Sequence, residues 1–106
     1  MLKAVFEGQV YQITIPPEVM RDGVDFFRRM NADMDRGWQM GREWVENPDA
    51  VQRCQIAADK LVDAIHGENE TLASLMAGYI VTQCPGTREV RIATDGEPME
   101  TELIGA

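Results

Sequence analysis

Apolar residues recur every three or four positions between residues 18 and 46, and this periodicity constrains the fold more than any other feature of the chain. At 100° per residue these positions fall on one broad face of a helix, opposite the charged residues of the same segment. The face comprises Met20, Val24, Phe27, Met30, Met34, Trp38, Gly41 and Val45. The spacing predicts one long helix of about 28 residues, which would measure roughly 40 Å at 1.5 Å per residue.

Two glycines, Gly37 and Gly41, lie inside this predicted helix. An interior glycine costs a helix about 1 kcal/mol relative to alanine, so a pair four residues apart requires a compensating gain. A bare backbone on the apolar face would allow close approach by the next helix of the same chain, by a second copy or by another protein. A bend near Gly37 is a further alternative, and it would shorten the helix.

A straight helix of this length would extend beyond a compact domain of 106 residues. We therefore expect the overhanging part of its apolar face to be buried in a homodimer. The predicted partner-binding residues are Phe27, Met30, Met34, Trp38, Met40, Gly41 and Trp44.

The rest of the chain predicts short strands at both ends and two more helices. Residues 3–7 and 10–15 are β-rich runs that form a hairpin, and residues 88–94 and 99–104 form a second one. Asn47 is a good N-cap for a second helix that Gly67 closes, and a third helix follows to Cys84. The expected fold is a single α+β domain over residues 1–106. It has a three-helix core with a long first helix, and its two hairpins pair into one small antiparallel sheet.

Charge and cysteine usage exclude several classes of function. The net charge of −8 disfavours binding to nucleic acids and to anionic membranes. The sequence shows no signal peptide and no apolar run long enough to span a membrane. Its two cysteines, Cys54 and Cys84, match no metal or redox motif, and we interpret both as inert core thiols. These features predict a cytoplasmic protein.

A stripe of carboxylates and one histidine is the candidate metal site. Asp59, Asp63 and His66 follow one another at helical spacing, and these residue types are ligands in di-metal helical bundles. The stripe lies opposite the apolar face of the second helix, however, so we expect it to face solvent. The sequence also has no second histidine to complete such a site.

Catalytic motifs are not apparent in the sequence. With one histidine and one serine, Ser74, in helical context, most acid–base and nucleophilic schemes are excluded. An active site between two copies, near Arg88 and Arg91, stays open as an alternative. We expect no cofactor. The predicted function is that of a small acidic accessory or regulatory protein, which forms a homodimer and binds a basic protein partner. The alternative function is metal or small-molecule binding by the carboxylate–histidine stripe.

Overall fold

The computed structural model describes residues 1–105, and its two ends form one four-stranded sheet. The strands are β1 (Leu2–Phe6), β2 (Gln9–Ile13), β5 (Thr87–Arg91) and β6 (Glu102–Gly105). They lie in the order β2-β1-β5-β6, with antiparallel pairing inside each terminal hairpin. The prediction that both hairpins join one small sheet is confirmed. Its central pair, β1 and β5, is parallel, so the sheet is antiparallel only within the hairpins.

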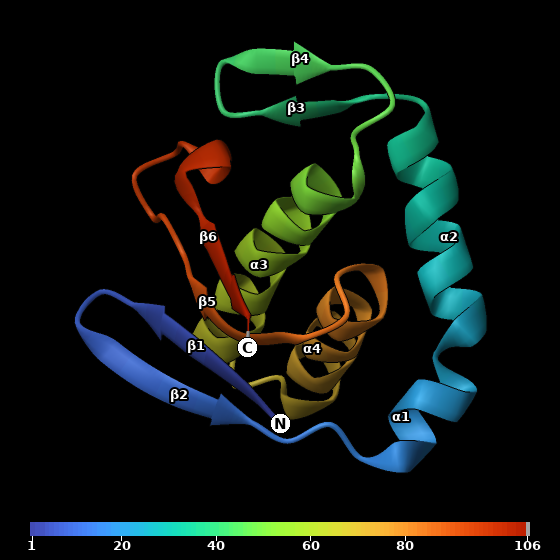
Figure 1. The fold of residues 1–106 in the computed structure, drawn as a ribbon, viewed down its shortest axis with the longest axis vertical. Helices are drawn as coiled ribbons and strands as arrows, with labels where there is room; N and C mark the ends of the chain where they lie inside the picture. The colour runs from blue at the N-terminus through green and yellow to red at the C-terminus, as the bar shows by residue number, and fades with distance from the viewer. Residues whose placement is uncertain (106) are drawn as a thin grey trace.

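Four α-helices lie on one side of this sheet, and α3 and α4 pack directly against it. They are α1 (Pro17–Asp22), α2 (Val24–Asp35), α3 (Ala50–His66) and α4 (Glu70–Gln83), and a short 3-10 helix, η1 (Pro98–Glu100), precedes β6. Figure 1 shows α3 and α4 between the sheet and the α1–α2 segment, which gives three layers. The predicted α+β class is therefore confirmed. Within residues 1–105, no helix is both long and apolar enough to cross a lipid bilayer.

The predicted long first helix is wrong, because glycine ends it. The segment divides at Gly23 into α1 and α2, and α2 ends at Asp35. Gly37 has a φ of +98° and Gly41 a φ of +64°, which are left-handed conformations that a helix interior does not contain. The chain therefore turns at Gly37, as in the alternative of a bend at this residue. Residues 1–105 therefore contain no overhanging helix, and the structural reason for expecting a homodimer is removed.

A small β-hairpin replaces the second half of the predicted helix. Its strands are β3 (Trp38–Met40) and β4 (Glu43–Val45), paired in antiparallel register. The connecting turn has two residues, and Gly41 supplies the positive φ that such a turn requires at its first position. The hairpin lies at the end of the molecule where α2 ends and α3 begins (Figure 1).

Side-chain caps fix where α3 and α4 begin. The Asp49 carboxylate accepts a hydrogen bond from the Gln52 amide at 2.8 Å, and the Gln52 side chain accepts one from the Asp49 amide at 2.9 Å. This reciprocal capping box places the start of α3 two residues after the predicted N-cap, Asn47, which instead adopts a φ of +49° in the preceding turn. The side chain of Asn69 caps α4 by accepting a hydrogen bond from the Leu72 amide at 3.1 Å.

The core lies between the sheet and the helices. Leu2, Ala4 and Phe6 of β1 alternate toward the helices and are all buried. On the other side, the rings of Phe27 in α2 and Tyr79 in α4 meet edge to face at 5.8 Å. The helical hairpin α3–α4 is therefore packed on both of its sides, and α4 and the turn before it lie beside β2.

Candidate functional site: a groove between strand β2 and the α3–α4 turn

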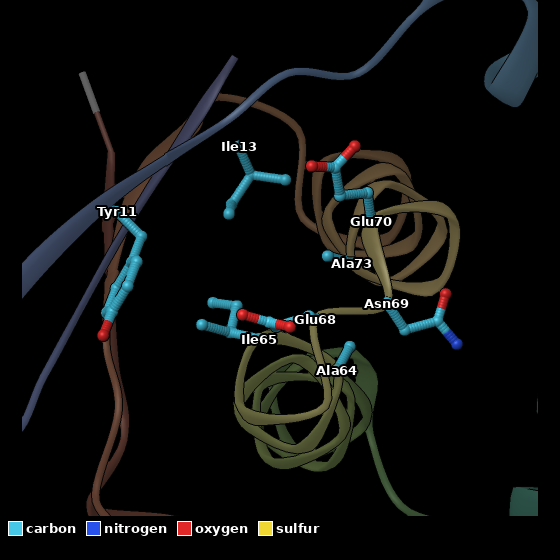
Figure 2. Close-up of a pocket in the computed structure, with 8 residues that line it drawn as sticks. All are labelled: Tyr11, Ile13, Ala64, Ile65, Glu68, Asn69, Glu70 and Ala73. Carbon is cyan, nitrogen blue, oxygen red and sulfur yellow. The ribbon is translucent and has the colours of Figure 1, made fainter.

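A cavity of about 540 Å³ opens between β2 and the turn that joins α3 to α4. Its lining comprises Tyr11, Ile13, Ala64, Ile65, Glu68, Asn69, Glu70 and Ala73. Figure 2 shows Ile13 and Glu70 on one side of the open space, Ile65 and Glu68 on the other, and Tyr11 at one end. Apolar side chains and two carboxylates therefore share the same surface.

A second cavity, of about 290 Å³, continues the first one along α4. The two share Ile13, Glu70 and Ala73, and the second extends to Thr14 and Ser74. The Ser74 hydroxyl donates a hydrogen bond to the Thr14 carbonyl at 2.9 Å, which ties α4 to the end of β2. Together the two cavities form an elongated groove, which we call the β2–α4 groove.

The turn between α3 and α4 places the two carboxylates of the groove. Gly67 ends α3, Glu68 adopts a φ of +55°, and Asn69 caps α4. A positive φ is uncommon for a residue with a side chain, and Glu68 holds it in the middle of a three-residue turn. This conformation aims the Glu68 carboxylate back over Ile65, whereas Glu70 lies beside Ile13 (Figure 2).

Aromatic packing supports the end of the groove formed by Tyr11. Its ring stacks on Phe6 at 4.9 Å between centroids, and Phe6 meets the ring of His66 edge-on at 5.7 Å. His66 also lies 3.1 Å from the Glu7 carboxylate. None of the side chains that line the groove within residues 1–105 is a lysine or an arginine. The groove therefore has a negative, partly apolar character.

The predicted partner-binding residues do not share one surface. Four of them lie in the hydrophobic core: Phe27, Met30, Met34 and Met40. Met40 is the buried end of β3, and the other three lie nearer the surface of the same β3–β4 hairpin: Trp38 is half-buried, Gly41 is exposed and Trp44 is 55% exposed. Partner binding therefore stays a prediction only for Trp38, Gly41 and Trp44 of the hairpin.

The predicted metal ligands are not gathered into a site. Asp59 is half-buried, Asp63 is exposed, and His66 pairs with Glu7 instead of with either aspartate. Among residues 1–105, no group of three or more histidine, cysteine, aspartate or glutamate side chains is placed to hold a metal ion. The stripe runs along α3 on the side of Trp38 and Lys60, and the Lys60 ammonium lies 5.0 Å from the centroid of the Trp38 ring.

Asp59 is the one carboxylate of the stripe with an altered pKa. Desolvation of the half-buried carboxyl group, and next the charge of Asp63, raise the pKa of Asp59 to about 6. A raised pKa means that the folded state favours the neutral carboxyl group. The stabilising contribution of the neutral form is complete below the unfolded pKa of about 4 and is lost as the pH rises through about 6.

We therefore expect Asp59→Asn to stabilise the protein at pH 7.5 and to have no effect at pH 4. The expected gain in the free energy of unfolding is only about 1 kcal/mol, because Asp59 is partly exposed to solvent. Urea denaturation at both pH values measures it, with the exposed Asp33→Asn as the matched control. An equal gain in the free energy of unfolding at both pH values would contradict the account that ionisation of the half-buried Asp59 destabilises the folded protein.

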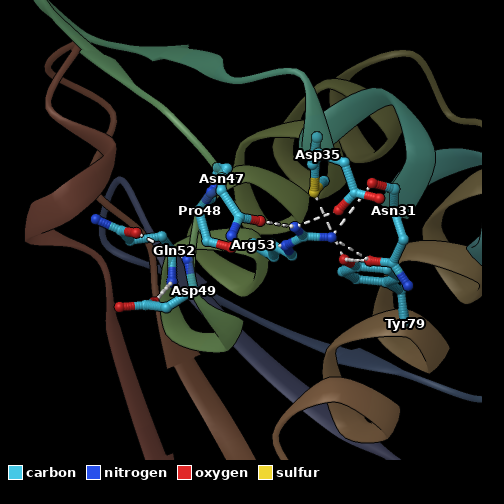
Figure 3. Close-up of polar contacts among 9 residues, drawn as sticks. Asn31, Asp35, Asn47, Pro48, Asp49, Gln52, Arg53 and Tyr79 are labelled. Carbon is cyan, nitrogen blue, oxygen red and sulfur yellow. Dashed lines mark hydrogen bonds and ion pairs between the residues drawn. The ribbon is translucent and has the colours of Figure 1, made fainter.

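A second polar cluster surrounds Arg53 of α3 and has a structural role (Figure 3). The guanidinium group donates hydrogen bonds to the Pro48 carbonyl, to the carbonyl and side-chain oxygen of Asn31, and to the side chains of Asp35 and Asn47. It thereby joins α2 to the segment before α3. Because these acceptors occupy its donors and its side chain is only 11% exposed, we assign Arg53 to stability and not to ligand binding.

Neither the sequence pattern nor known proteins point to the β2–α4 groove. Comparison of the chain with protein-family models, curated proteins and solved structures finds no significant match. In the sequence, Tyr11 and Ile13 belong to an alternating strand, and Glu68 and Glu70 resemble ordinary surface charge. Only the packing of β2 against the α3–α4 turn brings these residues together, so the chemistry of the groove carries the functional conclusion.

Proposed function

We propose that this protein is an accessory subunit that binds a basic, extended segment of a partner protein in the β2–α4 groove. The observation that supports the proposal is the groove itself, an apolar channel with the carboxylates of Glu68 and Glu70 on opposite sides. The predicted role as an accessory or regulatory protein is kept, and its contact surface moves to the groove.

Lysine and arginine side chains fit this combination of surfaces. Each carries an apolar stem, which can lie against Tyr11, Ile13 and Ile65, and a cationic head, which a carboxylate can bind at the mouth of the groove. A hydrogen bond between two charged groups is stronger than one between neutral groups. The net charge of −8 would also speed the approach of a basic partner.

The length of the groove favours an extended segment over a compact ligand. The two connected cavities follow the chain from Tyr11 in β2 to Thr14 just after it, and Glu70 lines both of them. A peptide that alternates basic and apolar residues would place side chains of both kinds along this path. Cavities of a few hundred Å³ suit a few side chains and not a whole folded domain.

Isothermal titration calorimetry with a short amidated peptide of alternating leucine and arginine tests the proposal. The double variant Glu68→Gln, Glu70→Gln removes both charges and keeps the shape of the side chains. We expect it to bind at least about tenfold more weakly, which corresponds to about 1.4 kcal/mol. Raising the salt concentration should also weaken binding to the wild type, since the carboxylates are exposed.

The matched control is Glu18→Gln, Glu102→Gln, which removes two exposed charges on α1 and β6. It changes the net charge by the same amount and leaves the groove intact. Equal weakening in both double variants would show that the peptide responds only to overall charge, and the proposal would then fail.

Homodimer formation stays a prediction, and it now depends on the exposed face of the β3–β4 hairpin. Native mass spectrometry of the wild type and of Trp44→Ser tests it, because Trp44 is the large apolar side chain exposed there.

A metal or small-molecule role for Asp59, Asp63 and His66 gains no support from their positions in the structure.

A further inference from the structure

The two cysteines, thirty residues apart in the sequence, lie side by side in the structure. The Sγ atoms of Cys54 and Cys84 are 3.3 Å apart. Cys54 lies in the N-terminal half of α3, and Cys84 is the residue that caps the end of α4. The interpretation of two separate inert thiols therefore misses their contact, because no local spacing in the sequence signals it.

The two thiols differ in their access to solvent. Cys54 is completely buried, and burial together with the neighbouring Cys84 thiol raises its pKa. Cys84 is partly exposed at the end of α4, where its Sγ atom lies 3.7 Å from the Ala50 carbonyl. A small oxidant from solvent would thus meet Cys84 first, with Cys54 directly behind it.

We propose that Cys54 and Cys84 are a modification site at which a hydroperoxide forms an intramolecular disulfide. A disulfide requires a sulfur–sulfur distance of about 2.05 Å, so the two atoms need to approach by about 1.3 Å. Side-chain rotation at Cys84 can supply this movement, because the backbone of this residue is not helical. Its φ is −126° and its ψ is 79°. This inference is independent of the proposed function.

The chemistry balances in two steps. The Cys84 thiol first releases its proton to water, and the thiolate attacks one oxygen of the hydroperoxide. The O–O bond breaks, Cys84 becomes a sulfenic acid, and the other oxygen takes up a proton from water and leaves as water or an alcohol. The Cys54 sulfur then attacks the Cys84 sulfur, the S–O bond breaks, and the hydroxyl group leaves as water with the Cys54 proton. The two thiols together lose two electrons, and the peroxide gains them.

Closure would join the open ends of the α3–α4 hairpin. The helices are already connected at their other ends by the turn from Gly67 to Asn69. The disulfide would therefore close a covalent loop made of α3, this turn and α4. A cross-link over a loop of thirty residues restricts the unfolded chain strongly. We expect the melting temperature of the oxidised protein to exceed that of the reduced protein by roughly 5–15 °C.

Intact mass spectrometry of the reduced full chain, after treatment with a small excess of hydrogen peroxide, tests this site. The expected product is a monomer about 2 Da lighter, which resists thiol alkylation until it is reduced again. In Cys54→Ser the reaction should stop at Cys84, with a gain of about 16 Da. In Cys84→Ser the buried Cys54 should stay unmodified.

Two outcomes would overturn the inference. One is a wild-type protein that gains oxygen and keeps it, as Cys54→Ser should do. The other is a disulfide between two chains, which non-reducing electrophoresis detects as a dimer. Either result would show that the neighbouring thiols do not react with each other within one molecule.

Discussion

Replacing Gly37 with alanine should lower the free energy of unfolding by about 3 kcal/mol, through backbone strain and loss of packing together. Gly37 has a φ of +98°, which residues with a Cβ atom rarely adopt. A Cβ atom built here would lie 2.5 Å from Cζ2 of Trp44, so the indole ring would have to move away. Thermal and urea denaturation measure the loss, and tryptophan fluorescence reports the displaced ring.

Gly86→Ala separates the two parts of this effect. Gly86 has a similar φ of +91°, but a Cβ atom there meets no described atom within 4 Å. It should therefore cost only the backbone strain, about 1–2 kcal/mol. Equal losses at Gly37 and Gly86 would contradict the packing of Trp44 over Gly37.

Replacing Arg53 with alanine should also cost about 3 kcal/mol, because several buried or half-buried acceptors would lose their donor. The guanidinium group bonds the Pro48 carbonyl at 2.8 Å, the Asp35 carboxylate at 2.7 Å and both oxygens of Asn31. Asp35 itself is 62% exposed, which keeps the expected loss below that of a fully buried ion pair. The melting temperature should fall by roughly 10–20 °C.

Two further variants identify the source of the Arg53 effect. Arg53→Lys retains the charge but not the planar set of donors, and we expect it to recover less than half of the loss. Arg28→Ala removes an exposed arginine that pairs with Asp25 at 3.6 Å, and it should change stability by no more than about 0.5 kcal/mol. A similar small change in Arg53→Ala would contradict the network in Figure 3.

The strand and helix patterns of the sequence predict most of the fold, and the first helix shows where they fail. Phe27, Met30 and Met34 do form the buried stripe of α2. The same spacing then continues by coincidence through Trp38 and Gly41, which belong to the β3–β4 hairpin. Periodicity alone cannot separate these cases, since a glycine can end a helix with a positive φ as readily as it can sit on an apolar face.

The functional surfaces depend on contacts between distant segments, which explains why sequence patterns do not reveal them. Tyr11 and Glu68 line one cavity only because β2 packs beside the α3–α4 turn, and Cys54 contacts Cys84 only because the two helices are antiparallel neighbours. The Asp59–Asp63–His66 stripe shows the reverse. Its residues have the spacing of metal ligands, yet the His66 side chain contacts Glu7 in the turn between β1 and β2.

The measurement that tests the central claim most directly is a two-dimensional ¹H–¹⁵N NMR titration of the protein with the leucine–arginine peptide. We predict saturable shifts at residues 11–14, 64–65, 68–70 and 73–74, which line the β2–α4 groove, and none with a matched leucine–glutamate peptide. Shifts that instead gather at the indole NH groups of Trp38 and Trp44 would assign binding to the β3–β4 hairpin. That result, or the absence of saturable shifts, would contradict the groove as the site that recognises a basic partner.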